Sequence, residues 1–320
     1  MTQPPPSLDP SPGERGLASA PDDRLARSVA RSWELFVAMV DDVDLDAVTR
    51  AKGLTAREVV IPLGAWHDNR PLADLVADAR RGTGGDHVQS ALVDAVRAAH
   101  LGDSDDEVRE ALRRQGRELS SYLAAPDPEG LRDAPVASML GTLPLVTFLH
   151  AATYPLATSA LDLERAGAVV PAELLDLGLL GLVDTIGALA ARLGLTASIA
   201  AVTPTYAVGT GSHKGSWHTR VLWPETPGPT FDPPADSASY GPSVRGTARI
   251  LLDVTAGRAD VPGAVARKEL AVHDISGLMA LAPIVEAVPG IPGRTALVAA
   301  IRATQALGAA WRLLPWTRGS

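Results

Sequence analysis

The chain has 320 residues, of which 46% are hydrophobic and only 4% aromatic, and its formal net charge is −8. This length exceeds that of one typical hydrophobic core, so we expect two domains with mainly aliphatic interiors. The acidic balance and the lack of a basic run argue against nucleic-acid partners. The absence of cysteine excludes disulfides, thiolate metal ligands and a cysteine nucleophile, and it is compatible with a cytoplasmic protein.

The N-terminal part reads as a tail followed by a helix. Residues 1–22 are rich in proline and lack the apolar core and basic start of a signal peptide, so we expect a disordered tail. From residue 22 to residue 43, apolar side chains recur at helical spacing, beginning with Leu25, Val29 and Trp33. This segment is predicted to be the first helix of an all-α domain over 23–168.

The most distinctive stretch is Gly53–Trp66, which reads GLTAREVVIPLGAW. Thr55 followed three residues later by Glu58 is a capping box, in which each side chain satisfies a free backbone N–H at the start of a helix. Pro62 then falls inside the predicted helix, where it removes a backbone donor and is expected to cause a kink. We expect this helix, or its continuation past the kink, to run on to Arg81.

Two amphipathic helices are predicted next, over 86–100 and over 105–125, the second capped by Ser104. The stretch from Ala134 to Leu161 contains no charged residue and is long enough to span a bilayer. Its three prolines and the lack of a flanking positive cluster favour instead a buried helix over 135–163, bent at its prolines. We therefore expect no stable membrane span.

The second half of the chain changes pattern. A further apolar helix is predicted over 173–193, after a boundary near residue 168, and residues 216–223 alternate in polarity as a strand does. GTGSHKG reads as the turn before that strand, and a Pro/Gly/Ser-rich loop follows it. The later segments are predicted to be helices over 247–256, 276–288 and 294–314 and a short strand over 269–273. We expect an α+β domain over 169–292 and a C-terminal helix within 293–320.

Several of these phrases resemble the mycothiol-dependent maleylpyruvate isomerase family. GLTAREVVIPLGAW is similar to that family's GWTVRDVVAHLAGW type of segment, and residues 86–125, ending in SSYLAA, match the third-helix region of its bundle. GSWHTRV and GTARILLDVTAGR resemble pieces of its second domain. The resemblance covers most of the chain from residue 23 to residue 292. It implies an N-terminal all-α DinB-like four-helix bundle and a C-terminal α+β sterol-carrier-like domain.

The resemblance also implies a divalent metal, usually zinc, in the bundle. In the family one His comes from the capped helix, and a Glu and a His spaced i,i+4 come from the later buried helix. Here Pro62 stands at the first position and Val146 at the second, so only His150 can act as a ligand. Three protein ligands are usual for a catalytic zinc, so we expect a degraded metal site. His67 lies close by, and a kink at Pro62 would redirect it.

Residues around these positions are the candidate ligand pocket: Trp66, His67, Val146, His150 and Tyr154. His150 has two interpretations, as a metal ligand or as a core residue hydrogen-bonded to Tyr154 one turn later. In the family an arginine of the second domain helps to bind the anionic substrate. The resemblance makes Arg220 and Arg245 the candidates here.

Three functions follow from these observations. The first is a mycothiol-dependent isomerase or S-transferase of this family type, with its metal site lost. The second is non-catalytic binding of a small apolar ligand. The third is a partner-binding role, with homodimerisation through 294–314. Metal content, co-purified lipid and oligomeric state distinguish the three.

Overall fold

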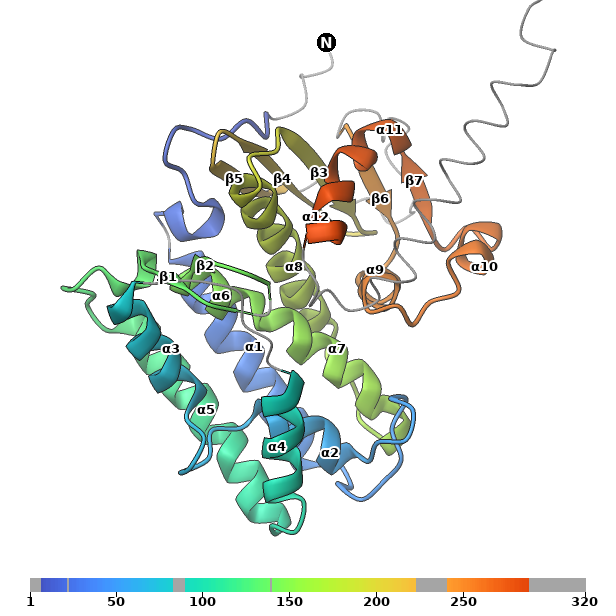
Figure 1. Cartoon of the computed structure of the whole chain (residues 1–320). Coiled ribbons are helices and arrows are strands. Elements are labelled where there is room, and N and C mark those ends of the chain that lie inside the picture. Colours follow the sequence, from blue (N-terminus) through green and yellow to red (C-terminus); the bar gives the residue numbers. More distant parts are fainter. Residues whose placement is uncertain (1–6, 22, 83–89, 139, 223–240, 288–320) are drawn as a thin grey trace, which may run out of the picture.

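The computed structural model describes residues 7–21, 23–82, 90–138, 140–222 and 241–287. A helical half and a sheet-containing half lie end to end, as Figure 1 shows, and helix α8 joins them. The helices of the first half are α1 (Arg24–Asp41), α2 (Ala56–Val60), α3 (Pro71–Arg81), α4 (Ser90–His100), α5 (Asp105–Ala124), α6 (Leu145–Ala151) and α7 (Thr153–Leu163).

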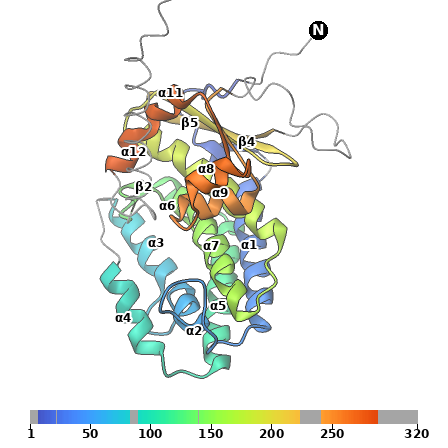
Figure 2. The ribbon, with the colours of Figure 1, turned by 90° about the vertical axis from the view of Figure 1, so that its right-hand side faces the viewer.

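The bundle is built on two long amphipathic helices. Helix α1 buries the apolar stripe predicted from its spacing, including Val29, Trp33 and Phe36, against α5 and α7. Helix α5 begins at a complete capping box formed by Ser104 and Glu107. The predicted helices in these two regions are confirmed, and Figure 2 shows them with the other helices of the bundle.

Pro62 ends a helix rather than kinking one. The capping box of Thr55 and Glu58 is present as predicted, but α2 stops after five residues at Val60. Pro62 is the second residue of the short 3-10 helix Ile61–Leu63, where the missing N–H is not needed. The chain then turns away at Gly64 and resumes as α3 at Pro71, so the prediction of one continuous kinked helix was wrong.

The long uncharged stretch is also divided. Residues 135–163 were predicted as one bent helix, but the segment begins with a hairpin of β1 (Pro135–Val136) and β2 (Leu143–Pro144). Two helices follow it, α6 and α7, which meet at Ala152. The segment is largely buried, as expected, since most of its described apolar side chains lie in the core.

Helix α8 (Ala172–Arg192) forms the centre of the molecule. It packs against α6 and α7 on one side and against three strands of the sheet on the other. Its length and composition are sufficient to cross a membrane, but 78% of its most apolar window is buried inside the protein. This burial is the pattern of a core helix shared by both halves. Hydrophobic packing therefore continues from one half to the other through α8. The domain boundary near residue 168 stays a prediction from the sequence.

The sheet has five strands in the order β5-β4-β3-β6-β7. Only the β3–β6 pair is parallel, and the other neighbours are antiparallel. The strands are β3 (Ala197–Val202), β4 (Ala207–His213), β5 (Ser216–Leu222), β6 (Ser243–Arg245) and β7 (Ala271–His273). The strands predicted at 216–223 and 269–273 are confirmed. GTGSH belongs to β4, and the hairpin turn is only Lys214–Gly215, both at positive φ.

The remaining elements are short helices of the second half. Helix α9 (Ala248–Thr255) agrees with the helix predicted over 247–256, and α10 (Val261–Ala266) follows it. The helix predicted over 276–288 is interrupted: α11 (Ile275–Leu278) and α12 (Ala282–Ala287) flank the 3-10 helix Met279–Leu281. Helix α9 packs against α7 and α8, and α11 packs against β3. The helix predicted over 294–314, and the homodimer contact assigned to it, lie outside the described residues.

Residues 7–21, predicted to belong to a disordered tail, are packed against the sheet. Leu8 lies over β4, the Glu14 carbonyl accepts a bond of 3.1 Å from the Trp217 backbone, and a 3-10 helix spans Gly16–Ser19. The segment covers the outer edge of β5, which has no other neighbouring strand among the described residues. Covering an edge in this way prevents its unpaired backbone from pairing with another chain.

Candidate functional site

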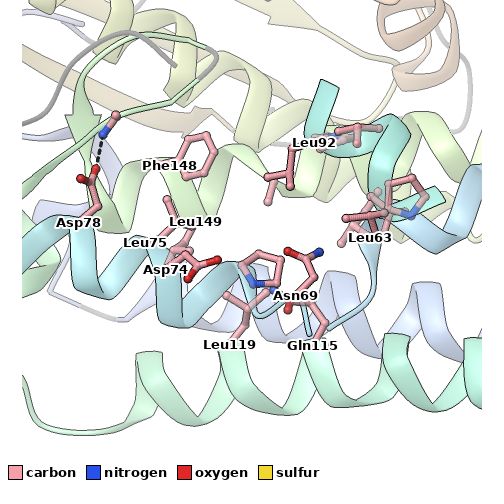
Figure 3. A pocket seen from close by; sticks show the side chains of 18 of the residues that line it. Leu63, Asn69, Asp74, Leu75, Asp78, Leu92, Gln115, Leu119, Phe148 and Leu149 are labelled. Carbon is pink, nitrogen blue, oxygen red and sulfur yellow. Dashed lines mark hydrogen bonds between the residues drawn. The ribbon is translucent and has the colours of Figure 1, made fainter. Parts of the chain in front are cut away.

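A partly open cavity of about 450 Å³ lies in the bundle and is lined by residues of α1, α3, α4, α5, α6, α7 and the 3-10 helix Ile61–Leu63. Its wall is mainly aliphatic and aromatic, as Figure 3 shows. The principal apolar side chains are Leu63, Leu75, Leu92, Leu119, Phe148 and Leu149. A cavity of this size and character matches a site for a small organic ligand.

Two buried polar atoms in this wall lack hydrogen-bond partners among the described residues. They are the indole Nε1 of Trp33 and the amide Oε1 of Gln115. Trp33 is only 4% exposed and Gln115 only 6% exposed, so bulk water does not satisfy them. A buried polar atom without a partner costs roughly 1–3 kcal/mol. Both atoms are sealed within the packed wall and are not exposed to the cavity.

Further polar groups lie along the wall formed by α3. Asp78 Oδ2 accepts a bond of 2.7 Å from the Ala137 backbone, and Asp78 Oδ1 lies 3.1 Å from the Arg81 guanidinium. Asp74 also lines the cavity, is exposed, and makes no ion pair with any described residue. One carboxylate in the wall is therefore not neutralised.

The residues named from the sequence do not all reach this cavity. Pro62 lines it, but the five pocket candidates do not. Trp66 is stacked on His100 with ring centroids 3.8 Å apart, and its Nε1 donates to the Ile61 carbonyl. His67 is exposed on the surface. The break after Val60 explains this outcome, because it separates Pro62 from Trp66 and His67.

Val146, His150 and Tyr154 lie elsewhere on the α6–α7 segment. Val146 is buried in the core, and burial raises the pKa of the half-buried Tyr154 phenol. His150 is completely buried and forms no bond with Tyr154. The candidate pocket proposed from the sequence is therefore not assembled, because α6 directs Phe148 and Leu149 into the cavity and His150 away from it.

His150 belongs to a sealed polar network between the two halves of the protein. Its Nδ1 lies 3.1 Å from Asp184 Oδ2, and its Nε2 lies 3.4 Å from Ser28 Oγ. Asp184 Oδ1 accepts hydrogen bonds from the Leu17 backbone at 3.2 Å, the Trp217 indole at 3.1 Å and the Thr219 hydroxyl at 2.7 Å. The chain of contacts from Ser28 to His150 to Asp184 has the same order as a Ser-His-Asp catalytic triad. All three side chains are buried, however, so no substrate reaches the serine.

These residues do not fit a zinc ion at the positions that the family resemblance implies. Pro62 and Val146 offer no donor atoms, and both nitrogens of His150 face other partners. In the described ranges, the His, Asp and Glu side chains form no group of three that could hold a metal. A catalytic zinc usually takes three protein ligands.

The two arginine candidates differ in their surroundings. Arg220 is exposed on β5. Arg245 is partly buried on β6, and its Nε and Nη2 atoms are inaccessible to water and have no hydrogen-bond partner among the described residues. Neither residue lines the bundle cavity.

Charged groups hold the C-terminal half against the bundle. Arg50 lies 3.0 Å from Asp253 and 3.2 Å from Glu164, and Arg258 lies 2.6 Å from Asp162. Burial raises the pKa of Asp162, and Arg258 opposes that effect. A further link joins α8 to the sheet region, where the Tyr206 hydroxyl donates to Asp176. Burial raises the pKa of both groups.

Sequence reasoning missed Gln115 and Asp184, although each carries a recognisable signal. Gln115 occupies a position of the α5 stripe between Leu112 and Leu119, where the pattern calls for an apolar side chain. Asp184 is an acidic residue in the middle of the apolar helix α8. A polar residue at a core position of an otherwise regular stripe is informative, because burying it requires a partner.

Known proteins were compared with the chain by family, by sequence and by structure. No family model matches the chain, and no curated protein matches it. Among solved structures, the crystal structure of the mycothiol-dependent maleylpyruvate isomerase is similar, with 15% sequence identity and a TM-score of 0.48. That similarity covers 76% of this chain and 92% of the other. A histidine-to-alanine mutant of the isomerase gives a TM-score of 0.46 at 15% identity, over 77% of this chain and 93% of its own.

Proposed function

We propose that the protein binds a small, mainly apolar organic molecule in the bundle cavity. The observation that carries this proposal is a partly open space of about 450 Å³ with a mainly aliphatic wall. Apolar side chains that line such a space remain in contact with water. A bound apolar molecule that fills the space removes this apolar surface from water, which is favourable.

The test is the identification of a co-purified molecule and its loss on filling the cavity. Ala152 lines the cavity, so an Ala152→Phe variant places a ring inside it. The matched control is Ala77→Phe on the exposed side of α3. We expect organic extraction and mass spectrometry to recover one molecule from the wild type and the control. Its retention by Ala152→Phe at the wild-type amount would contradict the proposal.

A second candidate is the isomerase or S-transferase activity that the sequence resemblance implies, with mycothiol as the thiol. Arg245 favours it, because a planar guanidinium with free hydrogen-bonding positions suits a carboxylate substrate. The poor fit of the residues to zinc counts against the metal-dependent form of that chemistry.

The second candidate is tested by turnover of maleylpyruvate with mycothiol, with and without added zinc. Arg245→Gln is expected to abolish any activity, whereas Arg220→Gln, on the exposed surface, is expected to retain it. Absence of turnover by the wild-type protein under both conditions rejects this candidate and leaves the binding proposal intact.

A further inference from the structure

We infer that the ligand of the bundle cavity is an amphiphile with a single polar end, bound with its apolar tail inside and its polar end in water at the mouth. This inference rests on the proposed function and adds the chemical class and the orientation of the ligand. It follows from three features of the lining: where the side chains are exposed, which polar atoms the buried part offers, and where the charges lie.

The exposure of the lining residues shows where the cavity opens. A side chain that lines a cavity and is also exposed to bulk solvent lies at the opening, which we call the mouth. Among the described lining residues, the exposed ones come from α3, α4 and α7, and they are Asp74, Arg81, Leu92 and Pro155. Leu92 is 48% exposed, which is unusual for a large apolar side chain. The mouth is therefore framed by these three helices.

The buried part of the lining, which we call the floor, offers a ligand almost no polar partner. Its residues are at most 7% exposed, and they are Trp33, Val96, Gln115, Leu119, Leu149 and Leu156. Four of these six side chains are hydrocarbon. The Trp33 indole nitrogen and the Gln115 amide oxygen are sealed within the wall, so the side chains of the floor present at most the NH₂ group of Gln115.

This floor selects an apolar inner end. A polar group of a ligand that reached the floor would lose its water and regain at most one hydrogen bond, and burial of a polar group without such replacement is unfavourable. A hydrocarbon tail has no such cost. Each methylene that it buries strengthens binding about fourfold. The polar end of the ligand is therefore placed at the mouth, where water still reaches it.

The charged lining residues agree with this orientation, because all of those described lie on α3, towards the mouth. Arg81 pairs with Asp78 at 3.1 Å, and its side chain is 62% exposed. Asp74 is also exposed. Water and salt screen exposed charges, so each contributes little to the binding of a charged group nearby. We therefore expect hydration, rather than a specific ion pair, to hold the polar end, and its charge to have little effect on affinity.

The experiment compares four probes with the same eight-carbon chain. They are 1-octanol, octylamine, octanoate and 1,8-octanediol, titrated into the full-length protein at pH 7 by calorimetry after any bound molecule has been removed. The first three differ in the charge of one polar end, and we expect their dissociation constants to agree within about fivefold. The diol has a polar group at both ends, and we expect it to bind at least about tenfold more weakly than 1-octanol.

Two matched variants separate the orientation from the greater water solubility of the diol. Leu119→Gln places an amide on the floor, one turn of α5 after Gln115, where it can bond the inner hydroxyl of the diol. It is expected to narrow the gap between 1-octanol and the diol to about threefold or less. Leu92→Gln makes the same change at the mouth and is expected to leave the gap unchanged. If Leu119→Gln does not fold, the four probes on the wild-type protein still test the inference.

The outcomes separate this inference from the proposed function. If the protein carries a molecule that Ala152→Phe loses, but none of the four probes binds, the cavity is a ligand site and the amphiphile assignment is overturned. The assignment is also overturned if the diol binds as tightly as 1-octanol, or if one charge is preferred by more than about tenfold. A gap that both Gln variants narrow equally, or that a folded Leu119→Gln leaves unchanged, overturns the orientation. If no molecule co-purifies and no probe binds, both proposals fail.

Discussion

His150 and Asp184 meet inside the protein with Nδ1 of the imidazole 3.1 Å from Oδ2 of the carboxylate, and both side chains are fully buried. The carboxylate can only accept, so the proton between them belongs to Nδ1 of the histidine. Nε2 is then free to accept a bond from the Ser28 hydroxyl, 3.4 Å away. This arrangement gives the buried histidine a structural role, as one of the two interpretations from the sequence proposed, but with Asp184 rather than Tyr154 as its partner.

Replacement of Asp184 by Asn is expected to destabilise the protein by about 2–4 kcal/mol. An uncharged amide weakens every hydrogen bond that the carboxylate accepts. Its NH₂ group can also face the Nδ1–H of His150, so that two donors meet. The measurement is equilibrium unfolding in urea. Asp176→Asn on the same helix is the control. Asp176 accepts a hydrogen bond from the Tyr206 hydroxyl, and burial raises the pKa of this carboxyl group, so the amide there is expected to cost less than about 1 kcal/mol. Equal losses in the two variants would contradict the role assigned to Asp184.

Gly16 holds the N-terminal segment at the closest approach to Asp184. Its φ is 54°, and a Cβ atom would lie 2.1 Å from Asp184 Oδ1 and 2.2 Å from the Trp217 indole nitrogen. Gly16→Ala is therefore expected to lower the free energy of unfolding by about 2 kcal/mol or more. Gly13 also has a positive φ, of 80°, but has open space around it. Gly13→Ala is expected to cost about 1 kcal/mol, and the difference between the variants measures the steric part.

Gln115→Leu is expected to stabilise the ligand-free protein by about 1 kcal/mol, because it removes a buried acceptor that has no partner among the described residues. The measurement is the urea midpoint after removal of any bound molecule. Leu119→Ala is the contrasting variant on the same wall. It removes apolar contacts and enlarges the cavity, so it is expected to cost about 2–4 kcal/mol. Destabilisation by Gln115→Leu would show that the amide has a structural role instead.

Glu164 makes part of the free energy of unfolding depend on pH in the acid range. Its hydrogen bond with Arg249, with Arg50 beside it, lowers the pKa of Glu164 below the ordinary value of 4.5. A carboxyl group whose pKa is lower in the folded state stabilises that state above pH 4.5, and this contribution is lost as the pH falls through the lowered pKa. Glu164→Gln is expected to remove about 1 kcal/mol at pH 7 and to flatten the decline in stability below pH 4.5.

The control for Glu164 is Glu129→Gln. Glu129 pairs with Arg80, but both side chains are more than half exposed. A surface ion pair of this kind contributes little, so the variant is expected to match the wild type at all pH values. An unchanged pH profile in Glu164→Gln would show that the contacts of Glu164 with Arg50 and Arg249 do not couple the two halves.

Local rules predicted the beginnings of elements better than their ends. The capping boxes at Thr55 and Ser104 were predicted because each needs only residues three positions apart. Pro62 was correctly identified as a disturbance of the helix, but the predicted kink is a break. Whether the chain bends or breaks there depends on the neighbours of the loop after it, and the spacing of apolar residues does not contain that information.

The candidate site was predicted less well, since it depends on the rotation of α6. A helix that lies between two layers has apolar residues on both faces. Residues 145–151 are apolar on nearly all sides, so their pattern does not show which face points to which layer. The sequence therefore did not reveal that Phe148 and Leu149 face the cavity while His150 faces Asp184. That arrangement depends on α8, which approaches α6 from the side opposite the cavity.

The position of the N-terminal segment has a consequence for synthesis. The backbone N–H of Leu17 is bonded to a carboxylate 167 residues further along the chain, and that carboxylate also needs the indole of Trp217. During synthesis, the N-terminal segment therefore cannot form all of its native contacts until β5 has been made. Until then, residues 7–21 and the face of α8 that is later buried remain accessible to chaperones and proteases. The finished protein does not have this exposure.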